Sequence, residues 1–457
     1  FSAEPVAKAC LYITACGLYE ARLNGRRIGD FVLAPGSTDY RKRIQYQTYD
    51  VTELLQSGEN DLTVELADGW YRGSSGAKGR TNTYGTQSKL LAQLELTHTD
   101  GRMETVCTDE SWRWSNDGPI RFADLKDGEV VDARFAPSYS GKARRIKYTA
   151  NLTASDNVPV MERERFSPVE RITTPSGKTV LKFPQNLSGY LSFRLTAHEG
   201  QKVHITLGEM LGDDGELTLK NIQCVHHGKR TPLQELDYTC KEGRNEYTPK
   251  FFYGGFQYAQ VDTDIPFEAE DFTAVAVYSA FEEAGDFECS HPLINQLYRN
   301  TRWSLKSNST DLPSDCPTRE RMGWTGDSQI FFNTASYLVD YAAFARKSAA
   351  LKNVEANPDA DPSNPFYGKA VVFTGDMEMP RAEAAQAVAE LGAHVKSAVS
   401  RKTDYLVAGA QDPALVGAGG RSGKEEKAAA LNESGQGKIE ILDEAAFRAL
   451  LAQARGQ

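Results

Sequence analysis

The stretch Asp315-Cys-Pro-Thr-Arg-Glu320-Arg321-Met-Gly-Trp324-Thr-Gly-Asp327 places three carboxylates, arginine and an indole in one short segment. Cleavage of a glycosidic bond requires a carboxylic acid that protonates the leaving oxygen and a second carboxylate that acts at the anomeric carbon or on its attacking water. Arg321 is suited to holding a hydroxyl or tuning the acid, and Trp324 to stacking on a pyranose ring. The alternative interpretation is a solvated loop with ordinary ion pairs.

The residues before this stretch have the patterns of β-strands. Asn24-Gly25 indicates a hairpin, because both residue types tolerate a positive φ, and Gly58-Glu-Asn-Asp61 indicates another turn. A second all-β segment is expected from about residue 146 to 283. Its apolar residues alternate with the period of a half-buried strand, at Leu191, Phe193 and Leu195 and again at Val203, Ile205 and Leu207.

From Pro292 onward the pattern changes to the spacing of amphipathic helices. Apolar residues recur at Leu293, Leu297 and Trp303, and then from Ile330 to Tyr341. The following stretch, Asn357-Pro-Asp-Ala-Asp-Pro-Ser-Asn-Pro365, has the composition of a solvated linker. The sequence therefore predicts a break between two differently built parts of the chain.

Strands and helices alternate beyond the linker. Ala370-Val-Val-Phe-Thr and Tyr405-Leu-Val are predicted strands, and helices are predicted over 381–391, 424–431 and 443–451. This order predicts a small parallel sheet covered by helices.

The motif at 315–327 resembles the signature of the bacterial alpha-L-rhamnosidase family, inverting glycoside hydrolases that remove terminal L-rhamnose. Leu23-Asn-Gly, Asp39-Tyr-Arg-Lys-Arg and Asp68-Gly-Trp-Tyr-Arg-Gly are also similar to this family, and the resemblance runs from about residue 8 to Lys347. It implies two jelly-roll-like β-sandwich domains, over 1–143 and 144–283. It also implies the first helices of an (α/α)6 barrel, over 284–350.

The resemblance also implies a role for each motif residue. Glu320 is expected to be the general acid, Asp315, Arg321 and Asp327 to bind rhamnose hydroxyls, and Trp324 to form part of the pocket wall. In the family the general base comes from the later half of the barrel, and no residue of this chain aligns with it. We therefore expect impaired hydrolysis by a barrel that is truncated at Lys347.

The last part of the chain resembles a BRCT domain, most closely those of bacterial NAD-dependent DNA ligases and of the replication factor C large subunit. The similarity rests on Phe373-Thr-Gly375, Leu391-Gly-Ala-His-Val, Ser400–Gly409 and Gly423-Lys-Glu-Glu-Lys427. We expect a linker over 351–365 and this domain over 366–457.

Four residues of this part are candidates for binding a phosphate or a partner. By the resemblance, Thr374, Gly375 and Lys424 occupy the positions of a phosphate site, and Arg381 stands where DNA-binding members contact a phosphate. An anion suits a helix start because unsatisfied N–H groups and the helix dipole point there. Plain turn chemistry and protein docking remain alternative interpretations.

The composition is that of a multidomain globular protein of 457 residues. The net charge of -10 argues against a general nucleic-acid coat, so any DNA contact is expected to be local. The 7 cysteines show no metal-ligand spacing and are interpreted as reduced and mostly buried. His226-His227 is not expected to share a metal, because neighbouring side chains of a strand point to opposite faces.

No cofactor, signal peptide or membrane span is predicted. The cytoplasm is favoured, although the compartment stays open because the first residue is not Met and the N-terminus is interpreted as incomplete. Trp70, Tyr71 and Tyr84 fit either sugar stacking or, as the favoured interpretation, closure of a core.

Three hypotheses follow for the whole chain. The first is an alpha-L-rhamnosidase that acts on terminal L-rhamnose with impaired turnover. The second is a non-catalytic carbohydrate-binding or remnant chain whose BRCT domain docks a protein partner or a DNA 5′-phosphate. The third is an artefactual joining of two unrelated gene fragments at Lys347-Ser348.

Overall fold

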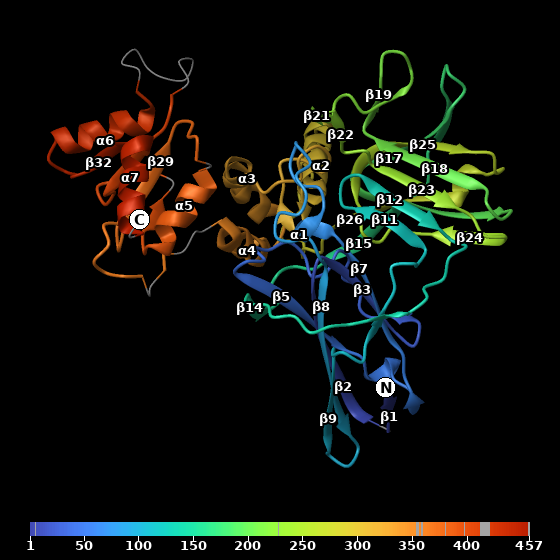
Figure 1. Cartoon of the computed structure of the whole chain (residues 1–457). Coiled ribbons are helices and arrows are strands. Elements are labelled where there is room, and N and C mark those ends of the chain that lie inside the picture. The colour runs from blue at the N-terminus through green and yellow to red at the C-terminus, as the bar shows by residue number, and fades with distance from the viewer. Residues whose placement is uncertain are drawn as a thin grey trace. The chain divides into compact units, whose positions relative to one another are not determined.

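The computed structural model describes residues 1–4, 6–226, 228–352, 356–357, 360–379, 381–396, 398–411 and 421–455. The chain divides into two compact units, one over residues 1–351 and the other over residues 352–457. Most strands belong to the first unit (Figure 1).

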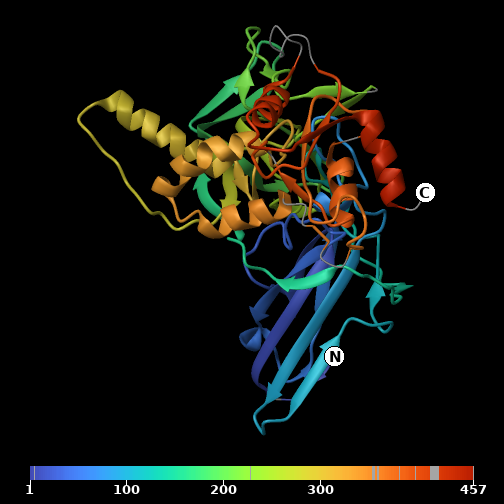
Figure 2. The same cartoon turned by 90° about the vertical axis from the view of Figure 1, so that its left-hand side faces the viewer.

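A β-sandwich of two antiparallel-rich sheets forms the amino-terminal part of the first unit. The five-stranded sheet has the order β14 (Asn151–Ala154), β5 (Arg43–Asp50), β2 (Val6–Cys16), β8 (Lys89–His98), β9 (Met103–Cys107). The three-stranded sheet has the order β4 (Arg26–Arg27), β3 (Leu18–Leu23), β7 (Leu62–Ala67). Figure 2 shows the long strands of the larger sheet lying side by side in blue and cyan.

The core of this sandwich follows directly from the alternation along its strands. Ala9, Leu11 and Ile13 of β2 are buried and pack with Leu94 and Leu96 of β8. The predicted hairpin is confirmed: Asn24 and Gly25 have φ values of 52° and 77° between β3 and β4. Two consecutive positive φ values suit a tight turn between right-twisted strands.

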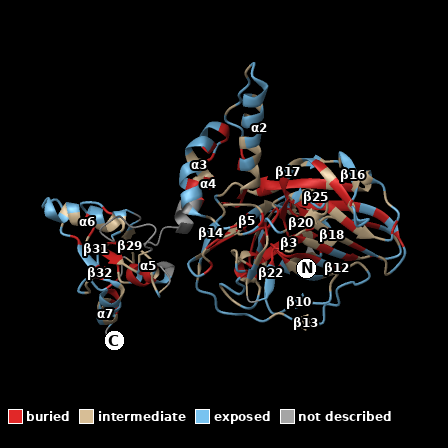
Figure 3. Ribbon diagram, turned by 90° about the horizontal axis from the view of Figure 1, so that it is seen from above, coloured by how far each residue is buried: buried red, intermediate tan, exposed pale blue. Residues whose placement is uncertain are grey.

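A ten-stranded sheet forms the second β-rich part. Its main path is β11 (Ile120–Asp124), β12 (Gly128–Asp132), β23 (Glu235–Thr239), β18 (Lys202–Gly208), β25 (Gly254–Thr263), β17 (Thr179–Ala197), β26 (Phe272–Ser279), β15 (Val160–Phe166). β16 (Glu170–Thr173) and β24 (Gly243–Tyr247) both pair with β17. Its central strands are the most continuously buried part of the unit (Figure 3).

Strand pairing crosses the predicted boundary at residues 143 and 144 in both directions. β11 and β12 precede this boundary but join the ten-stranded sheet through β23. β14 follows the boundary but pairs with β5 of the first sandwich. Alternation identifies a strand, whereas the choice of sheet depends on partners far away in the sequence.

Short elements close the loops of the first unit. They are β1 (Ser2–Ala3) with β6 (Gly58–Glu59), β10 (Arg113–Trp114) with β13 (Gly141–Lys142), β19 (Met210–Leu211) with β20 (Leu217–Thr218), β21 (Cys224–His226) with β22 (Lys229–Thr231), β27 (Ser309–Thr310) with β28 (Leu312–Pro313), the helix α1 (Gly69–Arg72), and the 3-10 turns at Thr52–Leu54 and Ala269–Asp271.

Three helices follow the sheets, as the change of periodicity predicts: α2 (Pro292–Ser307), α3 (Thr325–Leu338) and α4 (Ala342–Lys352). Leu305, Leu338 and Phe344 meet in a small core with Phe281 and Tyr341. Leu293 and Leu297 are largely exposed, contrary to the core-facing role that their spacing suggests. These helices do not establish the predicted (α/α)6 barrel.

The second unit confirms the predicted small parallel sheet. Its order is β30 (His394–Lys396), β29 (Ala370–Thr374), β31 (Tyr405–Ala408), β32 (Glu440–Asp443), and all three pairings are parallel. The helices are α5 (Arg381–Glu390), α6 (Gly423–Glu433) and α7 (Glu444–Ala454). Phe366, Phe373 and Phe447 lie in its core.

Part of the predicted linker is bound to the second unit. The N–H of Asn357 donates to the carbonyl of Ala389 at 2.7 Å, and the Asn364 amide donates to the Leu391 carbonyl at 3.0 Å. Residues 353–355 and 358–359 of the predicted linker lie outside the described residues. The segment carries no helix or strand between 356 and 365 where it is described, in keeping with its composition.

The cysteine prediction needs a correction. All seven are free thiols, but only Cys16 and Cys240 are buried, and Cys107 is exposed. Within the described ranges, no group of three or more His, Cys, Asp and Glu residues could hold a metal ion, and His227 lies outside them. No described helix is long and apolar enough to cross a membrane.

Candidate active site

The 315–327 motif forms the loop between β28 and the first turn of α3. Its expected acid, Glu320, accepts a hydrogen bond from the Trp324 indole at 2.8 Å, between Nε1 and Oε2. The Trp324 residue is 51% exposed, so its ring offers an apolar surface next to the carboxyl group. The loop therefore brings the Glu320 carboxyl group next to an exposed aromatic ring.

Asp315 is joined to Met322 across the loop by two hydrogen bonds. Its Oδ1 accepts from the Met322 N–H at 3.0 Å, and its own N–H donates to the Met322 carbonyl at 3.1 Å. Asp327 is exposed and lies in the first turn of α3, where the helix dipole stabilises a carboxylate. The roles of Asp315 and Asp327 in hydroxyl binding stay predictions.

Arg321 anchors the loop to the ten-stranded sheet and its neighbouring segments. Its guanidinium donates to the carbonyls of Thr318, Leu125 and Tyr253 and to Gln234 Oε1. The residue is 5% exposed and has a φ of 55°, a left-handed conformation that is uncommon outside glycine. Because four protein oxygens accept from four of its five N–H donors and the residue is buried, the geometry favours an anchoring role over the predicted hydroxyl contact.

A buried lysine lies beside this anchor. Lys126 Nζ donates to the Gly76 carbonyl at 2.6 Å, and the residue is 1% exposed. Burial, followed by the nearby charge of Arg321, lowers the Lys126 pKa to about 8, although Asp127 and Asp124 oppose the shift. Lys126 could not be predicted from the sequence, because a lone lysine in a strand connection carries no motif.

Asp311 is a second residue that the sequence analysis missed. Its carboxylate forms a buried ion pair with Lys347 of α4 and accepts from the Ser37 N–H at 2.5 Å. The Asn157 amide also donates to it at 3.2 Å. A Cβ on Gly36 would lie 2.5 Å from Asp311 Oδ1, so glycine allows this close approach. Asp311 thus joins α4 to the first sandwich just before the motif loop.

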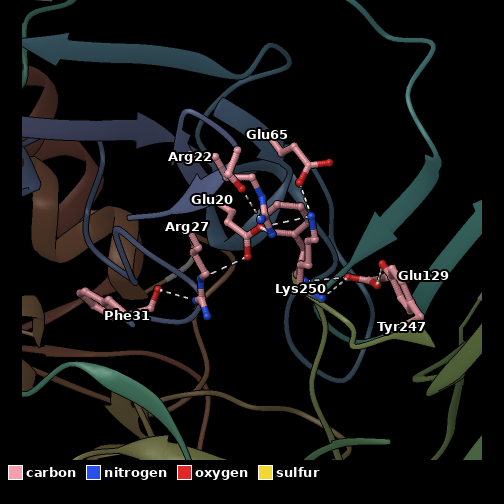
Figure 4. A network of polar contacts seen from close by, with 10 residues as sticks. Glu20, Arg22, Arg27, Phe31, Glu65, Glu129, Tyr247 and Lys250 are labelled. Atoms are coloured by element: carbon pink, nitrogen blue, oxygen red, sulfur yellow. Dashed lines mark hydrogen bonds and ion pairs between the residues drawn. The ribbon is translucent and has the colours of Figure 1, made fainter. Parts of the chain in front are cut away.

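A polar network connects the first sandwich with the segment that precedes β25 (Figure 4). Glu20 pairs with Arg22 at 2.8 Å, with Arg27 at 3.3 Å and with Lys250 at 3.1 Å. Burial alone would raise the Glu20 pKa, but Lys250, Arg27 and Arg22 outweigh it, so this pKa is lowered. Lys250 also pairs with Glu65.

The same network lines a cavity of about 290 Å³ next to Tyr190 and Tyr247. Glu129, which is buried, accepts from the Tyr247 hydroxyl at 2.7 Å and from the Phe251 N–H at 2.7 Å. Burial raises the pKa of Glu129. These bonds satisfy the buried carboxyl, and the ion pairs of Lys250 with Glu20 and Glu65 join the two β-rich parts.

The aromatic residues near Trp70 close a core, as the favoured interpretation expects. Tyr71 is buried and its ring lies 5.1 Å from the Tyr40 ring and 6.4 Å from the Tyr84 ring. Trp70 and Tyr84 pack against the same cluster.

The candidate phosphate residues of the second unit lie at the end of β29 and the start of α6. Thr374 Oγ1 lies 3.2 Å from Ser422 Oγ, and Lys424 Nζ donates to the Phe373 carbonyl at 3.0 Å. Gly375 has a φ of 73°. Ser422 forms a capping box with Glu425, whose carboxylate accepts from the Ser422 N–H at 2.8 Å. The Arg381 side chain lies outside the described part.

Three family descriptions cover the first unit in succession. Alpha-L-rhamnosidase N-terminal domain matches residues 4–171, bacterial alpha-L-rhamnosidase concanavalin-like domain matches 172–278, and bacterial alpha-L-rhamnosidase 6 hairpin glycosidase domain matches 282–377. The BRCT domain description matches 361–451. β29 lies where the last two matches overlap, and its pairing with β30 and β31 places it in the second unit.

Curated and solved relatives agree with these matches. An alpha-L-rhamnosidase of Streptomyces avermitilis is 37% identical over 75% of this chain and 34% of its own length, and one of Formosa agariphila is 36% identical over 74% and 38%. The crystal structure of the Streptomyces avermitilis alpha-L-rhamnosidase complexed with L-rhamnose has a TM-score of 0.71 at 35% identity, over 76% of this chain and 34% of that one. The chain thus spans about a third of the length of these relatives.

The second unit has relatives of another kind. A DNA ligase of Ruegeria sp. is 45% identical over 114 residues, which are 25% of this chain and 13% of the ligase. The chain therefore belongs to the bacterial alpha-L-rhamnosidase family over its first unit and carries, in its second unit, a BRCT domain with relatives among DNA ligases.

Proposed function

We propose that the first unit recognises a terminal L-rhamnose at the 315–327 loop, with Glu320 as the proton donor. The observation that carries this proposal is the bond between the Trp324 indole and the Glu320 carboxyl group beside an exposed ring. A sugar stacked on that ring would bring its glycosidic oxygen close to the acid. The complex of a relative with L-rhamnose supports this choice of sugar.

Arg321 and Asp315 have a positioning role in this proposal. Arg321 fixes the loop from the protein side, through Gln234 and the carbonyls of Leu125 and Tyr253. Asp315 sets the position of Met322 across the loop. Asp315 and Asp327, the latter exposed in the first turn of α3, are the candidates for hydroxyl contacts.

Hydrolysis with inversion also requires a second carboxylate, at roughly 6.5 to 9.5 Å from the acid. The sequence analysis expects impaired turnover because no residue of this chain aligns with the family's general base. This expectation stays a prediction. Release of nitrophenol from an aryl alpha-L-rhamnoside tests the acid role directly. We expect Glu320→Gln to lower any turnover by about 100-fold to 10,000-fold, whereas the exposed control Glu288→Gln leaves it unchanged.

Equal turnover in the protein and in Glu320→Gln would contradict the role of Glu320. Binding of L-rhamnose without any turnover would limit the chain to recognition, the non-catalytic hypothesis of the sequence analysis. Sequencing one continuous molecule of the gene across Lys347-Ser348 tests the hypothesis of joined fragments, because a break in the read would separate the two units.

We infer a second function for the BRCT domain, the binding of a phosphate group such as a DNA 5′-phosphate. Thr374, Ser422 and Lys424 converge at the start of α6, where the helix dipole favours an anion. The Glu425 carboxylate already binds Ser422, so a phosphate would displace it.

A 5′-phosphorylated DNA duplex is the probe for this site, compared with the same duplex lacking the phosphate. We expect tighter binding of the phosphorylated duplex, and loss of that preference in Lys424→Met but not in the exposed control Lys402→Met. Equal binding of both duplexes would favour a protein-docking role instead.

A further inference from the structure

The turn between β11 and β12 holds two loops at the same time. Arg321 of the 315–327 loop donates to the carbonyl of Leu125 in this turn. The next residue of the turn, Lys126, donates from Nζ to the Gly76 carbonyl at 2.6 Å. Neighbouring residues of one turn therefore fix the motif loop and the segment around Gly76 relative to each other.

This second segment is a small hairpin over residues 75–80. Ser75 and Arg80 each donate a backbone N–H to the other's carbonyl, both at 2.9 Å. At the base of the hairpin, the Ser74 N–H donates to the buried Asp124 carboxylate at 2.7 Å. Together with the lysine bond described above, this contact fixes the hairpin to the turn.

The hairpin contacts the motif loop at the side chain of Met322. Ser75 Oγ donates to Met322 Sδ at 3.4 Å, and a Cβ on Gly76 would lie 3.9 Å from Met322 Cγ. Methionine has three rotatable bonds, and its thioether sulfur is a weak acceptor. The hairpin therefore limits the positions that this flexible and 39% exposed residue can take.

The main chain of Met322 in turn orders the motif loop. Its carbonyl accepts from the Asp315 N–H at 3.1 Å and from the Trp324 N–H at 2.9 Å. Its own N–H donates to Asp315 Oδ1 at 3.0 Å. Met322 thus sets the Asp315 carboxylate and the backbone of the residue whose indole binds Glu320.

We propose that Lys126 and Ser75 are positioning residues, which hold the motif loop in its binding conformation through Met322. Lys126 fixes the 75–80 hairpin, Ser75 of the hairpin contacts Met322, and Met322 orders the loop. This inference rests on the proposed recognition of L-rhamnose at the loop. Neither positioning residue needs to contact the sugar, because both act through Met322.

The anchor at Arg321 does not make the hairpin redundant. Its guanidinium bonds fix the Arg321 side chain, whereas the rotation of the following peptide unit also depends on where Met322 lies. A purely stabilising role is the alternative. It predicts that loss of the hairpin contacts lowers the stability of the whole unit without a specific effect on the loop.

Hydrogen–deuterium exchange of the peptide that carries residues 315–327 separates these roles, because Ser75→Ala and Lys126→Met leave its sequence unchanged. We expect its exchange to become about two-fold to ten-fold faster in both variants, since each loses one hydrogen bond that opposes local opening. Lys78→Met is the matched control, because Lys78 is exposed in the same hairpin.

The affinity for L-rhamnose, measured on the same proteins, gives the second readout. We expect it to fall by up to about ten-fold in Ser75→Ala, in Lys126→Met and in Met322→Ala. Met322→Leu is expected to restore part of the loss, because it nearly conserves the side-chain volume. Met210→Ala, at a 46% exposed methionine of β19, is expected to leave the affinity unchanged.

Unchanged exchange of the loop peptide in both Ser75→Ala and Lys126→Met would overturn the proposal. Exchange that rises equally in β2 would show a general loss of stability and would overturn it as well, as would an unchanged L-rhamnose affinity in a variant with a faster loop. Faster loop exchange in a chain that binds no L-rhamnose would confirm the control of the loop and refute the proposed function, so the two failures are distinguished.

Discussion

Lys347 Nζ lies 2.6 Å and 2.7 Å from the two carboxylate oxygens of Asp311, and both side chains are buried. Lys347 belongs to α4, whereas Asp311 connects β27 to β28 and also binds the Ser37 N–H of the first sandwich. This ion pair therefore fixes the helical part against the β-rich part of the first unit.

Lys347→Met tests the pair. The change leaves the Asp311 charge buried without its partner, and such a loss costs about 3–5 kcal/mol. We expect the free energy of unfolding, measured in urea, to fall by that amount, and the added change Asp311→Asn to restore part of it. Lys182→Met removes the exposed pair with Glu170 and is expected to cost about 0–1 kcal/mol. Equal losses in the two lysine variants would contradict the account.

The variant Arg321→Lys distinguishes an anchoring role of Arg321 from a direct contact with the sugar. A lysine cannot reach the four oxygens that the Arg321 guanidinium binds, so we expect a loss of at least about 3 kcal/mol in the free energy of unfolding. Arg319→Lys, at an exposed neighbour, is expected to change stability by less than about 0.5 kcal/mol. Unchanged stability with abolished L-rhamnose binding would show instead that Arg321 contacts the sugar.

The low pKa of Lys126 predicts a pH dependence of stability. Burial lowers this pKa from 10.5 to about 8, so the unfolded chain binds more protons than the folded chain between these values. Stability contributed by this group therefore rises as the pH increases from about 8 to 10.5. We expect Lys126→Met to lack this rise in urea unfolding at a series of pH values. Parallel curves for the two proteins would refute the prediction.

The lowered pKa of Glu20 predicts that the stability of the protein depends on pH in the acid range. Because Lys250, Arg27 and Arg22 lower its pKa below 4.5, its contribution to stability is present above pH 4.5 and is lost as the pH falls through the lowered value. We expect Glu20→Gln to be less stable at pH 7 and to lose less stability than the unchanged protein between pH 5 and pH 3. Glu59→Gln, at an exposed position, serves as the control.

The sequence predicts local elements well and long-range relationships poorly. The alternation in β2 and β17, the Asn24-Gly25 turn and the βα order of the second unit are all visible locally, because they follow from side-chain period and backbone freedom. The place of β11 and β12 in the ten-stranded sheet is not visible locally, because it depends on pairing with β23, more than a hundred residues later in the chain.

The same limit applies to the candidate site. Glu320 and Trp324 stand four residues apart and carry a recognisable pattern, whereas Asp311, Lys126 and Lys347 have no local signature. Their importance comes from burial and from partners in distant segments. Arg321 shows the opposite case, since its type suggests a sugar contact but its surroundings bind it to the protein.

The central claim is that the loop at 315–327 recognises L-rhamnose, and ligand-observed NMR of L-rhamnose with the whole chain tests it most directly. Trp324→Ala is compared with Trp114→Ala, because the two tryptophans are exposed to nearly the same degree, 51% and 52%. We predict saturation transfer to the sugar in the unchanged protein and in Trp114→Ala, and its loss in Trp324→Ala. No transfer in any of the three proteins, or equal transfer in all of them, would contradict the account.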